Sequence, residues 1–320
     1  MEIRRLGRSG LKVSSVWLGG NTFGWTTDEK ASFAVLDAYV EGGGNAVDSA
    51  DSYSRWAPGN VGGESEIVLG NWLKSRKNRH QVVVATKVAT RMGDLPHEAG
   101  LSRRWIMEAV EHSLRRLQVD YIDLYQAHRD DPETPLDETM RAFADLIQQG
   151  KVRYIGASNY SAWRLTRTIW ESDRGGHPRF ESIQPKFNIV DRDEYERELE
   201  PMIREFEVGV VTYSSLASGF LSGKYQRGGT LPTSKRAGGV ERSYFNDRGW
   251  RILDAVQAVA GRLNATPSQV ALAWIIQRPG MTAPIASATT PEQAREILGA
   301  ATLRLDVEAV ASLDSASAWK

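Results

Sequence analysis

The chain has 320 residues, with 40 basic and 40 acidic side chains and no cysteine. Balanced charge provides no long-range field for nucleic acid or an anionic membrane, so neither is an expected partner. The lack of cysteine excludes a disulfide framework, a thiol nucleophile and a thiolate metal site. No apolar run approaches the ~18 residues of a membrane span, and the amino terminus lacks the apolar core of a signal peptide. We therefore expect a cytoplasmic protein.

The first residues predict a β-hairpin, since residues 3–6 and 11–13 flank a turn at residues 7–10. A strand over residues 16–18 follows, and from there strand and helix patterns alternate. We expect further strands over residues 45–48, 81–87, 122–128, 152–158, 182–188, 209–214 and 282–286. Helices are expected over residues 28–40, 64–74, 161–171, 194–206, 250–263 and 307–316, and after Ser102, His128, Thr266 and Thr290.

Several of these helices carry recognisable start signals. Thr26 with Glu29 three residues later predicts a capping box, and Ser102 predicts a side-chain cap. Thr266-Pro267-Ser268-Gln269 combines a capping box with proline at the first helical position, and Thr290-Pro291-Glu292-Gln293 repeats this signal. Residues 218–246 are expected to form a long loop rich in Gly and Ser.

Eight strand–helix units without a separating linker predict one domain over residues 1–320, an α/β (β/α)8 TIM barrel with an N-terminal β-hairpin. The alternative is a doubly wound open sheet, which usually carries a glycine-rich dinucleotide turn after its first strand. The only Gly-x-Gly is Gly42 with Gly44, and Val47 stands three positions further on. That fingerprint is therefore absent, which favours the barrel.

Polar residues close the predicted strands: Asp48, Lys87 and His128, with Tyr53 in the loop after Asp48. Each alone fits a cap, a rim aromatic or a surface turn, but together they predict an active site at the carboxyl face. An ammonium close to a phenol lowers its pKa from about 10. Lys87 is expected to do this for Tyr53, with Asp48 holding the lysine and His128 orienting a carbonyl. The set suits proton donation to a carbonyl oxygen. No metal is expected, because no ligand cluster has metal spacing.

With these residues, the chain resembles the aldo-keto reductase family from Leu6 to about Leu313. The long loop over residues 55–63 is similar to the bacterial branches and the potassium-channel β-subunit relatives. The matching stretches are Asp48-Ser49-Ala50-Asp51-Ser52-Tyr53, Ala85-Thr86-Lys87, Tyr125-Gln126-Ala127-His128, Gly156-Ala157-Ser158-Asn159-Tyr160, residues 213–225 and Thr290-Pro291-Glu292-Gln293.

The resemblance implies a barrel that binds NADPH in an extended pose and reduces a small-molecule carbonyl substrate, with Tyr53 as proton donor assisted by Lys87, Asp48 and His128. It also implies the following cofactor positions: Gly20, Asn21, Thr22 and Asp48 beside the cofactor; Ser158, Asn159 and Gln184 at the nicotinamide carboxamide; Tyr213 stacked on its ring; Ser214, Leu216, Ser218, Gly219 and Lys224 at the pyrophosphate; and Ser287, Thr289, Gln293 and Glu296 toward the adenosine. As alternatives, Ser158 and Asn159 cap the next helix, and Gln184 satisfies buried backbone groups.

The chain departs from the family's pattern at two positions near the adenosine. Many relatives have Arg or Lys at the position of Thr289, where a cation grips the 2′-phosphate. Lys224 or Arg295 could compensate, so NADPH is expected with weakened selectivity and NADH as a possible cofactor. Ile297 stands where many relatives have Asn.

Two functions of different class remain: a carbonyl reductase and a cofactor-binding regulatory subunit that senses redox state with little turnover. All four catalytic positions are intact, which favours the enzyme. The substrate mouth is expected to contain residues of the 218–246 loop and Phe23, Trp25, Tyr53, Arg55 and Trp56. No sequence pattern predicts an oligomeric state.

Overall fold

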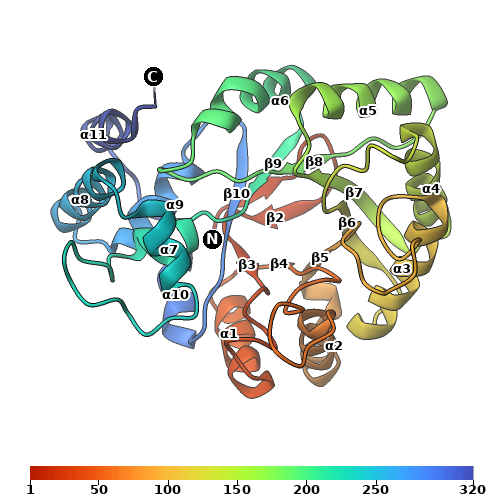
Figure 1. Ribbon diagram of the computed structural model, residues 1–320, viewed down its shortest axis with the longest axis horizontal. Helices are drawn as coiled ribbons and strands as arrows, with labels where there is room; N and C mark the ends of the chain where they lie inside the picture. The colour runs from red at the N-terminus through yellow and green to blue at the C-terminus, as the bar shows by residue number, and fades with distance from the viewer. Residues whose placement is uncertain (320) are drawn as a thin grey trace.

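Eight parallel strands close into a barrel in the computed structural model, which describes residues 1–319 (Figure 1). The order around the barrel follows the chain, with the last strand pairing with both its predecessor and the first barrel strand. The strands are β3 (Trp17–Gly19), β4 (Ala46–Asp48), β5 (Val83–Val88), β6 (Ile122–Ala127), β7 (Val152–Ser158), β8 (Ser182–Gln184), β9 (Gly209–Thr212) and β10 (Met281–Ala286). The predicted (β/α)8 fold is confirmed.

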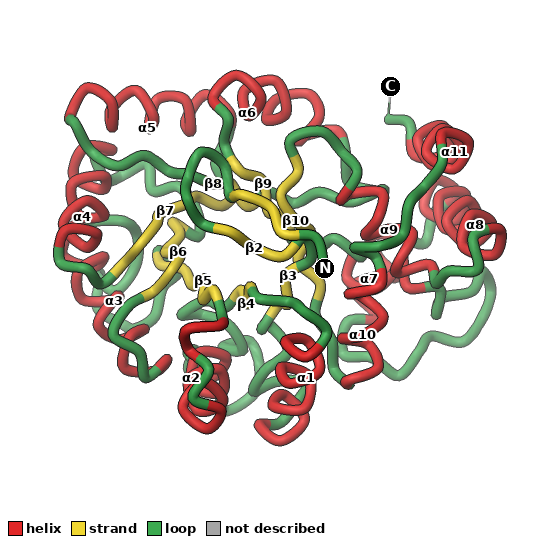
Figure 2. The backbone as a smooth tube through the Cα atoms, turned by 180° about the vertical axis from the view of Figure 1, so that it is seen from behind, coloured by secondary structure: helices red, strands yellow, loops and turns green. Residues whose placement is uncertain are grey.

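An antiparallel hairpin of β1 (Ile3–Arg5) and β2 (Lys12–Ser14) precedes the barrel, as predicted. Leu6 and Val13 are fully buried in a cluster with barrel residues near the strand starts, such as Trp17. The hairpin therefore covers the amino-terminal end of the barrel (Figure 2). Gly7 is required there, because its φ is +54° and a Cβ would lie 2.2 Å from the Glu181 carbonyl oxygen.

Helices form the outer layer and bury one face against the strands (Figure 1). They are α1 (Glu29–Glu41), α2 (Glu64–Arg76), α3 (Arg103–Leu117), α4 (Leu136–Gln148), α5 (Ala162–Gly175), α6 (Glu200–Phe206), α7 (Ala237–Tyr244), α8 (Asp247–Arg262), α9 (Pro267–Ile276), α10 (Pro291–Gly299) and α11 (Val307–Ser317). Short 3-10 turns η1 (Arg79–Gln81) and η3 (Ala217–Ser222) and a π-helix η2 (Tyr195–Leu199) complete the described chain.

The predicted caps are partly confirmed. The Ser102 side chain accepts from the Trp105 N–H, and Thr266 with Gln269 forms the full capping box. The box at Thr26 is wrong, because Asp28 caps α1 instead. A short carboxylate directly before the first turn can accept from the Ala31 N–H, and Thr26 lies two residues too early.

A second partial match is the start of α10. Thr290 caps it through the Gln293 N–H, as predicted. The Gln293 side chain does not complete a box: its Oε1 accepts from the N–H and the hydroxyl of Thr289.

Three predicted elements differ from the structure. The sixth strand stops at Gln184 because Pro185 has no N–H for the ladder. The helix predicted over residues 194–206 begins as the π-helix η2, since Pro201 lacks the N–H that an α-helix would bond four residues back. The loop predicted over residues 218–246 contains most of η3 and all of α7.

Candidate active site

Parallel pairing aligns the polar strand ends at one rim of the barrel. Gly19 pairs with Asp48, Asp48 with Ala85, and Lys87 with Gln126, so neighbouring strands end at similar heights. Further round the barrel, Ser158 pairs with Gln184. Because all these strands run in one direction, their carboxyl ends form a single face, where the predicted site lies.

The Lys87 side chain is fully buried at this rim and uses all three ammonium donors. Its Nζ donates to Asp48 Oδ2 at 2.7 Å, to the Ser49 carbonyl at 2.7 Å and to the Tyr53 hydroxyl at 2.9 Å. A buried ammonium is tolerated only when it is paired and hydrogen-bonded in this way. The structure therefore brings together three of the predicted residues, Lys87, Asp48 and Tyr53.

Two amides fix the other oxygen of Asp48. Gln184 Nε2 donates to Asp48 Oδ1 at 2.9 Å and Gln126 Nε2 at 3.3 Å, while the Tyr53 hydroxyl donates to Oδ2 at 3.1 Å. The amide of Gln184 thus orients Asp48. Gln126 was not predicted as a site residue, although its place two residues before His128 points it inward in the β6 alternation.

Burial is the main cause of the pKa shifts at this rim. It raises the pKa of Tyr53 well above its usual range, and the Asp48 carboxylate raises this pKa further. The expectation that Lys87 brings the Tyr53 pKa below that of free tyrosine is therefore wrong here, because burial and the Asp48 carboxylate both raise this pKa. Burial also lowers the pKa of Lys87 against the effect of Asp48, and it lowers the pKa of His128 well below its ordinary value. His128 is accordingly a neutral imidazole near pH 7.

His128 belongs to a second hydrogen-bond chain on the same rim. Thr90 Oγ1 lies 3.3 Å from His128 Nδ1, and Asn159 Nδ2 donates to the His128 carbonyl at 2.9 Å. The Tyr213 hydroxyl donates to Asn159 Oδ1 at 2.8 Å. Ser158 Oγ donates to the Gln184 carbonyl at 2.8 Å. Ser158 and Asn159 thus bond along the rim, and Ser161 takes the capping position of α5.

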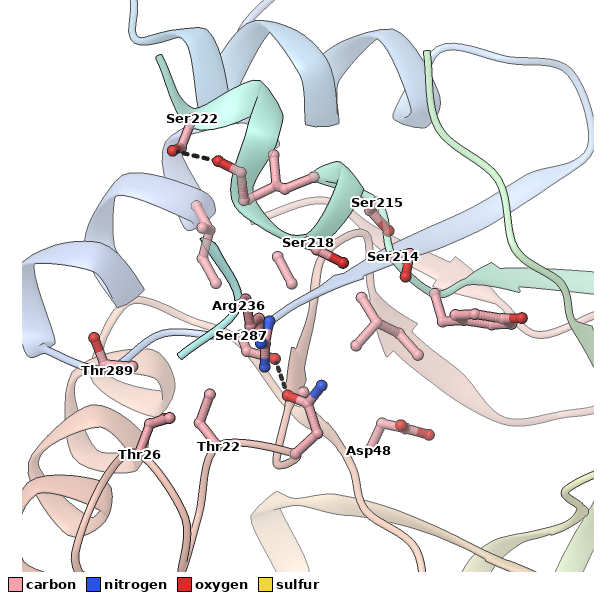
Figure 3. Close-up of a pocket in the computed structure, with 18 of the residues that line it drawn as sticks. Thr22, Thr26, Asp48, Ser214, Ser215, Ser218, Ser222, Arg236, Ser287 and Thr289 are labelled. Atoms are coloured by element: carbon pink, nitrogen blue, oxygen red, sulfur yellow. Dashed lines mark hydrogen bonds between the residues drawn. The ribbon is translucent and has the colours of Figure 1, made fainter. Parts of the chain in front are cut away.

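A cavity of about 1020 Å³ opens above this rim and runs along the carboxyl ends of the strands. Figure 3 shows Asp48 and Thr289 toward opposite ends of it, with hydroxyl side chains between them. The predicted residues in its wall are Asn21, Thr22, Asp48, Tyr53, His128, Ser158, Asn159, Gln184, Tyr213, Ser214, Leu216, Ser218, Gly219, Lys224, Ser287, Thr289, Gln293 and Glu296.

Two of the predicted catalytic and cofactor-binding positions lie outside this wall. Lys87 is buried behind Tyr53 and Asp48, which it contacts. Gly20 packs against α2, where a Cβ would lie 2.8 Å from Ser65 Oγ. Gly20 therefore allows a close approach of the first barrel strand to α2.

Residues 233–236 were expected in the substrate mouth as part of the 218–246 loop, but none of them was predicted as a cofactor-binding residue. Arg236 and Lys224 both line the cavity. Burial lowers the pKa of Lys224 and the charge of Arg236 lowers it further, while burial is also the main cause of the lowered pKa of Arg236. Among residues 1–319 neither side chain forms an ion pair with a carboxylate. In the sequence, the two adjacent cations Lys235 and Arg236 were the pattern that could have indicated an anion-binding segment.

Arg295, the other proposed partner for a 2′-phosphate, is outside the cavity. Its side chain is 60% exposed, and its guanidinium lies 3.8 Å from the Glu292 carboxylate on the surface of α10. Thr289 lines the cavity, as expected, and its hydroxyl donates to Gln293 at 3.0 Å. The cations available to a bound anion are therefore those of the 224–236 segment.

The backbone after β9 has an unusual conformation beside these cations. Ser214, Ala217 and Ser218 have φ values of 54°, 49° and 57°, and Gly219 has 93°. Left-handed conformations cost of order 1–3 kcal/mol for residues other than glycine and concentrate at ligand sites. The Ala217 and Gly219 N–H groups already donate to the Ser214 and Leu216 carbonyls. The polar groups that this segment adds to the cavity wall are therefore the hydroxyl side chains of Ser214, Ser215, Ser218 and Ser222.

Aromatic rings form the mouth on the Tyr53 side. Trp25 meets Trp56 edge-on with ring centroids 5.5 Å apart, and Trp56 lies 6.0 Å from the Tyr53 ring. The Arg236 guanidinium covers the Trp25 ring at 5.4 Å. Two predicted mouth residues do not belong to the wall: Phe23 is fully buried, and exposed Arg55 donates to the Arg91 carbonyl.

Sequence comparison decides the family. The pattern of the Aldo/keto reductase family matches residues 15–318. The chain belongs to the aldo/keto reductase family. The resemblance inferred from its motifs is thus confirmed.

Relatives of this aldo/keto reductase have both enzyme and channel-subunit names. "Uncharacterized oxidoreductase YrpG" of Bacillus subtilis is 36% identical over 98% of this chain and 95% of that protein. "Putative voltage-gated potassium channel subunit beta" of Schizosaccharomyces pombe is 36% identical over 92% of this chain and 86% of that protein. "Versiconal hemiacetal acetate reductase" of Aspergillus parasiticus is 33% identical over 98% and 96%. Oxidoreductase activity is therefore supported.

Two kinds of feature are absent from the described part of this aldo/keto reductase. Residues 1–319 contain no group of three or more His, Asp or Glu placed to hold a metal ion. None of the helices within this range is long and apolar enough to cross a bilayer.

Proposed function

We propose that this aldo/keto reductase is an NADP(H)-dependent oxidoreductase that reduces aldehydes or ketones to alcohols. The observation that carries the proposal is the contact of Lys87 Nζ with the Tyr53 hydroxyl at 2.9 Å, with Asp48 on the same ammonium. A phenol that must become an anion during reaction needs such a fixed positive charge. Tyr53 lies in the cavity wall, within reach of a substrate.

The fit of a phosphorylated dinucleotide rests on three features of the cavity. Lys224 and Arg236 supply positive charge without a carboxylate partner among the described residues, the serines of the 214–222 segment supply hydroxyl groups, and Tyr213 supplies a flat ring. Near Asp48, the cavity wall contains polar side chains that could hydrogen-bond a carboxamide, namely Ser158, Asn159 and Gln184. When bound, the dihydronicotinamide supplies a hydride to the carbonyl carbon.

In the proposed mechanism, Tyr53 gives its proton to the carbonyl oxygen. Its raised pKa keeps the hydroxyl protonated before reaction, and the Lys87 ammonium stabilises the phenolate afterwards. Asp48 keeps Lys87 charged, and two amides keep Asp48 in place. We assign the proton of neutral His128 to Nε2, with Nδ1 accepting from the Thr90 hydroxyl that lies 3.3 Å away. In this tautomer His128 orients the carbonyl by donating to its oxygen.

We infer a preference for NADPH over NADH that depends on the 224–236 segment. Thr289 offers only a hydroxyl where a cation would form a charge-assisted bond to the 2′-phosphate. Lys224, Lys235 and Arg236 all line the cavity and can supply this charge. The preference should therefore fall at high salt, and NADH should still support turnover.

The second candidate is a cofactor-binding regulatory subunit with little turnover. It is favoured by the 36% identity to a putative potassium channel β subunit, equal to the identity with the bacterial oxidoreductase. The distinguishing experiment measures NADPH oxidation with a panel of aromatic and aliphatic aldehydes and ketones, alongside the NADPH dissociation constant. Turnover with several carbonyls supports the reductase, whereas tight NADPH binding without turnover supports the sensor.

A further inference from the structure

Helix α5 has a stripe of four exposed side chains, Trp163, Arg167, Trp170 and Arg174. Their spacing of four, three and four residues places them on one face of the helix. The two indoles are 66% and 55% exposed, while the opposite face of α5 is buried. Figure 1 shows α5 at the outer edge of the barrel, next to α4. This set of four is called the α5 stripe.

The composition of the α5 stripe is that of an interface. Trp and Arg are enriched at the centres of protein–protein contacts, and exposed indoles leave much apolar surface in water. Neighbouring arginines cover the rings only in part. The Arg174 guanidinium lies 4.9 Å from the Trp170 ring centroid and that of Arg164 lies 6.0 Å from Trp163.

The order of the four residues identifies the partner. The midpoint between Trp163 and Arg174 falls between Thr168 and Ile169. The midpoint between Arg167 and Trp170 falls at the same place along the helix. Two copies of α5 packed antiparallel around a two-fold axis at this midpoint would therefore place each tryptophan opposite an arginine. Such an isologous contact is the commonest way in which identical chains associate. Each of the four opposed pairs can form a cation–π contact.

We propose that the α5 stripe is a self-association surface through which two copies of this chain pair by antiparallel contact of α5. None of the four side chains lines the cavity, so pairing leaves the candidate active site open. Four side chains per copy bury less than the ~1,200–2,000 Å² of a standard interface. The association is therefore weak, with a dissociation constant in the micromolar range.

Two charge variants test the pairing by sedimentation equilibrium. Trp163→Lys/Trp170→Lys leaves four cations on the stripe, so this variant should repel itself and remain monomeric. Arg167→Glu/Arg174→Glu replaces both cations, so its tryptophans lose their partners and dimerisation weakens.

A mixture of the two variants should restore a heterodimer. In the antiparallel arrangement, the lysines introduced at positions 163 and 170 would face the glutamates introduced at positions 174 and 167 of the other variant. The arginines that remain in the lysine variant would face the tryptophans that remain in the glutamate variant. Each opposed pair would therefore be attractive, as in the parent.

Val307→Lys is the matched control, since Val307 is 87% exposed on another helix. This variant should dimerise like the parent. Circular dichroism confirms folding of each variant, and the single variants Trp163→Lys and Trp170→Lys replace the double variant if it unfolds. A parent that stays monomeric up to about 100 µM would overturn the proposal. So would an unweakened dimer in the lysine variant, or a mixture that remains monomeric.

Discussion

At the scale of single residues, the central feature is one ammonium shared among three acceptors. Lys87 reaches Asp48, the Ser49 carbonyl and Tyr53 within 2.9 Å, and its side chain is fully buried. Because burial and the neighbouring Asp48 carboxylate raise its pKa, Tyr53 rests as a neutral phenol. In the proposed mechanism the ammonium therefore matters after the proton has left, when the phenolate must be stabilised.

Lys87→Met should reduce turnover by ~10²–10⁴, the usual scale for acid–base assistance. It should also destabilise the fold by about 3–5 kcal/mol, because Asp48 would remain buried without its ion partner. Steady-state kinetics and chemical denaturation measure the two effects. Lys74→Met, at an exposed position on α2, is the control and should change neither. Parent-like turnover in Lys87→Met would contradict the assigned role.

A pH profile tests the neutral state of His128. Its pKa lies well below the ordinary value because of burial, so its protonated form is disfavoured in the folded protein. We expect kcat/KM to be nearly constant from about pH 6 to pH 8, with no transition near the usual histidine pKa of about 6.5. A clear loss of kcat/KM centred near that pH, absent in His128→Gln, would show that the imidazole titrates normally.

At the scale of elements, the segment between β9 and α8 contributes most of what the sequence did not predict. Its Gly and Ser content suggested an open loop, but η3 and α7 form within it, and Arg236 precedes α7 directly. Short helices of this kind depend on tertiary packing, here of Val240 and Tyr244 in the core, more than on local propensity. Of the two compensating cations expected from the sequence, Lys224 lines the cavity, whereas α10 directs Arg295 to the surface.

Arg236→Ala should weaken NADPH binding by roughly one to two decades, because a charge-assisted hydrogen bond contributes ~1.5–3 kcal/mol. Fluorescence titration at low and high salt measures this. Arg295→Ala is the matched control, since this guanidinium is exposed and outside the cavity. An unchanged NADPH affinity in Arg236→Ala, or an equal loss in both variants, would contradict the assignment.

At the scale of the whole molecule, the alternation of strands and helices and the common direction of the strands could be predicted from the sequence, because they depend on local hydrophobic patterns. The strand ends Asp48, Lys87 and His128 could be predicted to share a rim, since all strands of such a barrel run one way. Two hydrogen bonds could not be predicted, because they depend on side-chain positions across neighbouring strands: that of Gln126 to Asp48 and that of Asn159 to the His128 carbonyl. Likewise, the effect of burial on Tyr53 required the packed cavity wall.

One buried carboxyl affects the stability of the entire fold. Asp51 is 1% exposed, neither of its side-chain oxygens has a hydrogen-bond partner among residues 1–319, and burial together with Glu66 raises its pKa to about 8. Its unfolded pKa is about 3.9, so the folded state holds the extra proton between these values. The free energy of unfolding should therefore fall as pH rises from about 4 through 8.

Asp51→Asn should raise the melting temperature relative to the parent at pH 8, where the parent begins to bury a charge, and should change it less at pH 5. Thermal unfolding at both pH values measures this difference. Asp94→Asn, at an exposed position, is the control. Equal effects of Asp51→Asn at the two pH values would contradict the raised pKa.

The most direct test of the proposed reaction is turnover by Tyr53→Phe. The variant keeps the aromatic ring but removes the hydroxyl that Lys87 and Asp48 contact, so kcat should fall by ~10²–10⁴ while the NADPH dissociation constant stays close to that of the parent. Tyr154→Phe, a partly buried tyrosine packed near the hairpin, should retain parent activity. Carbonyl reduction by Tyr53→Phe at close to the parent rate would contradict the account.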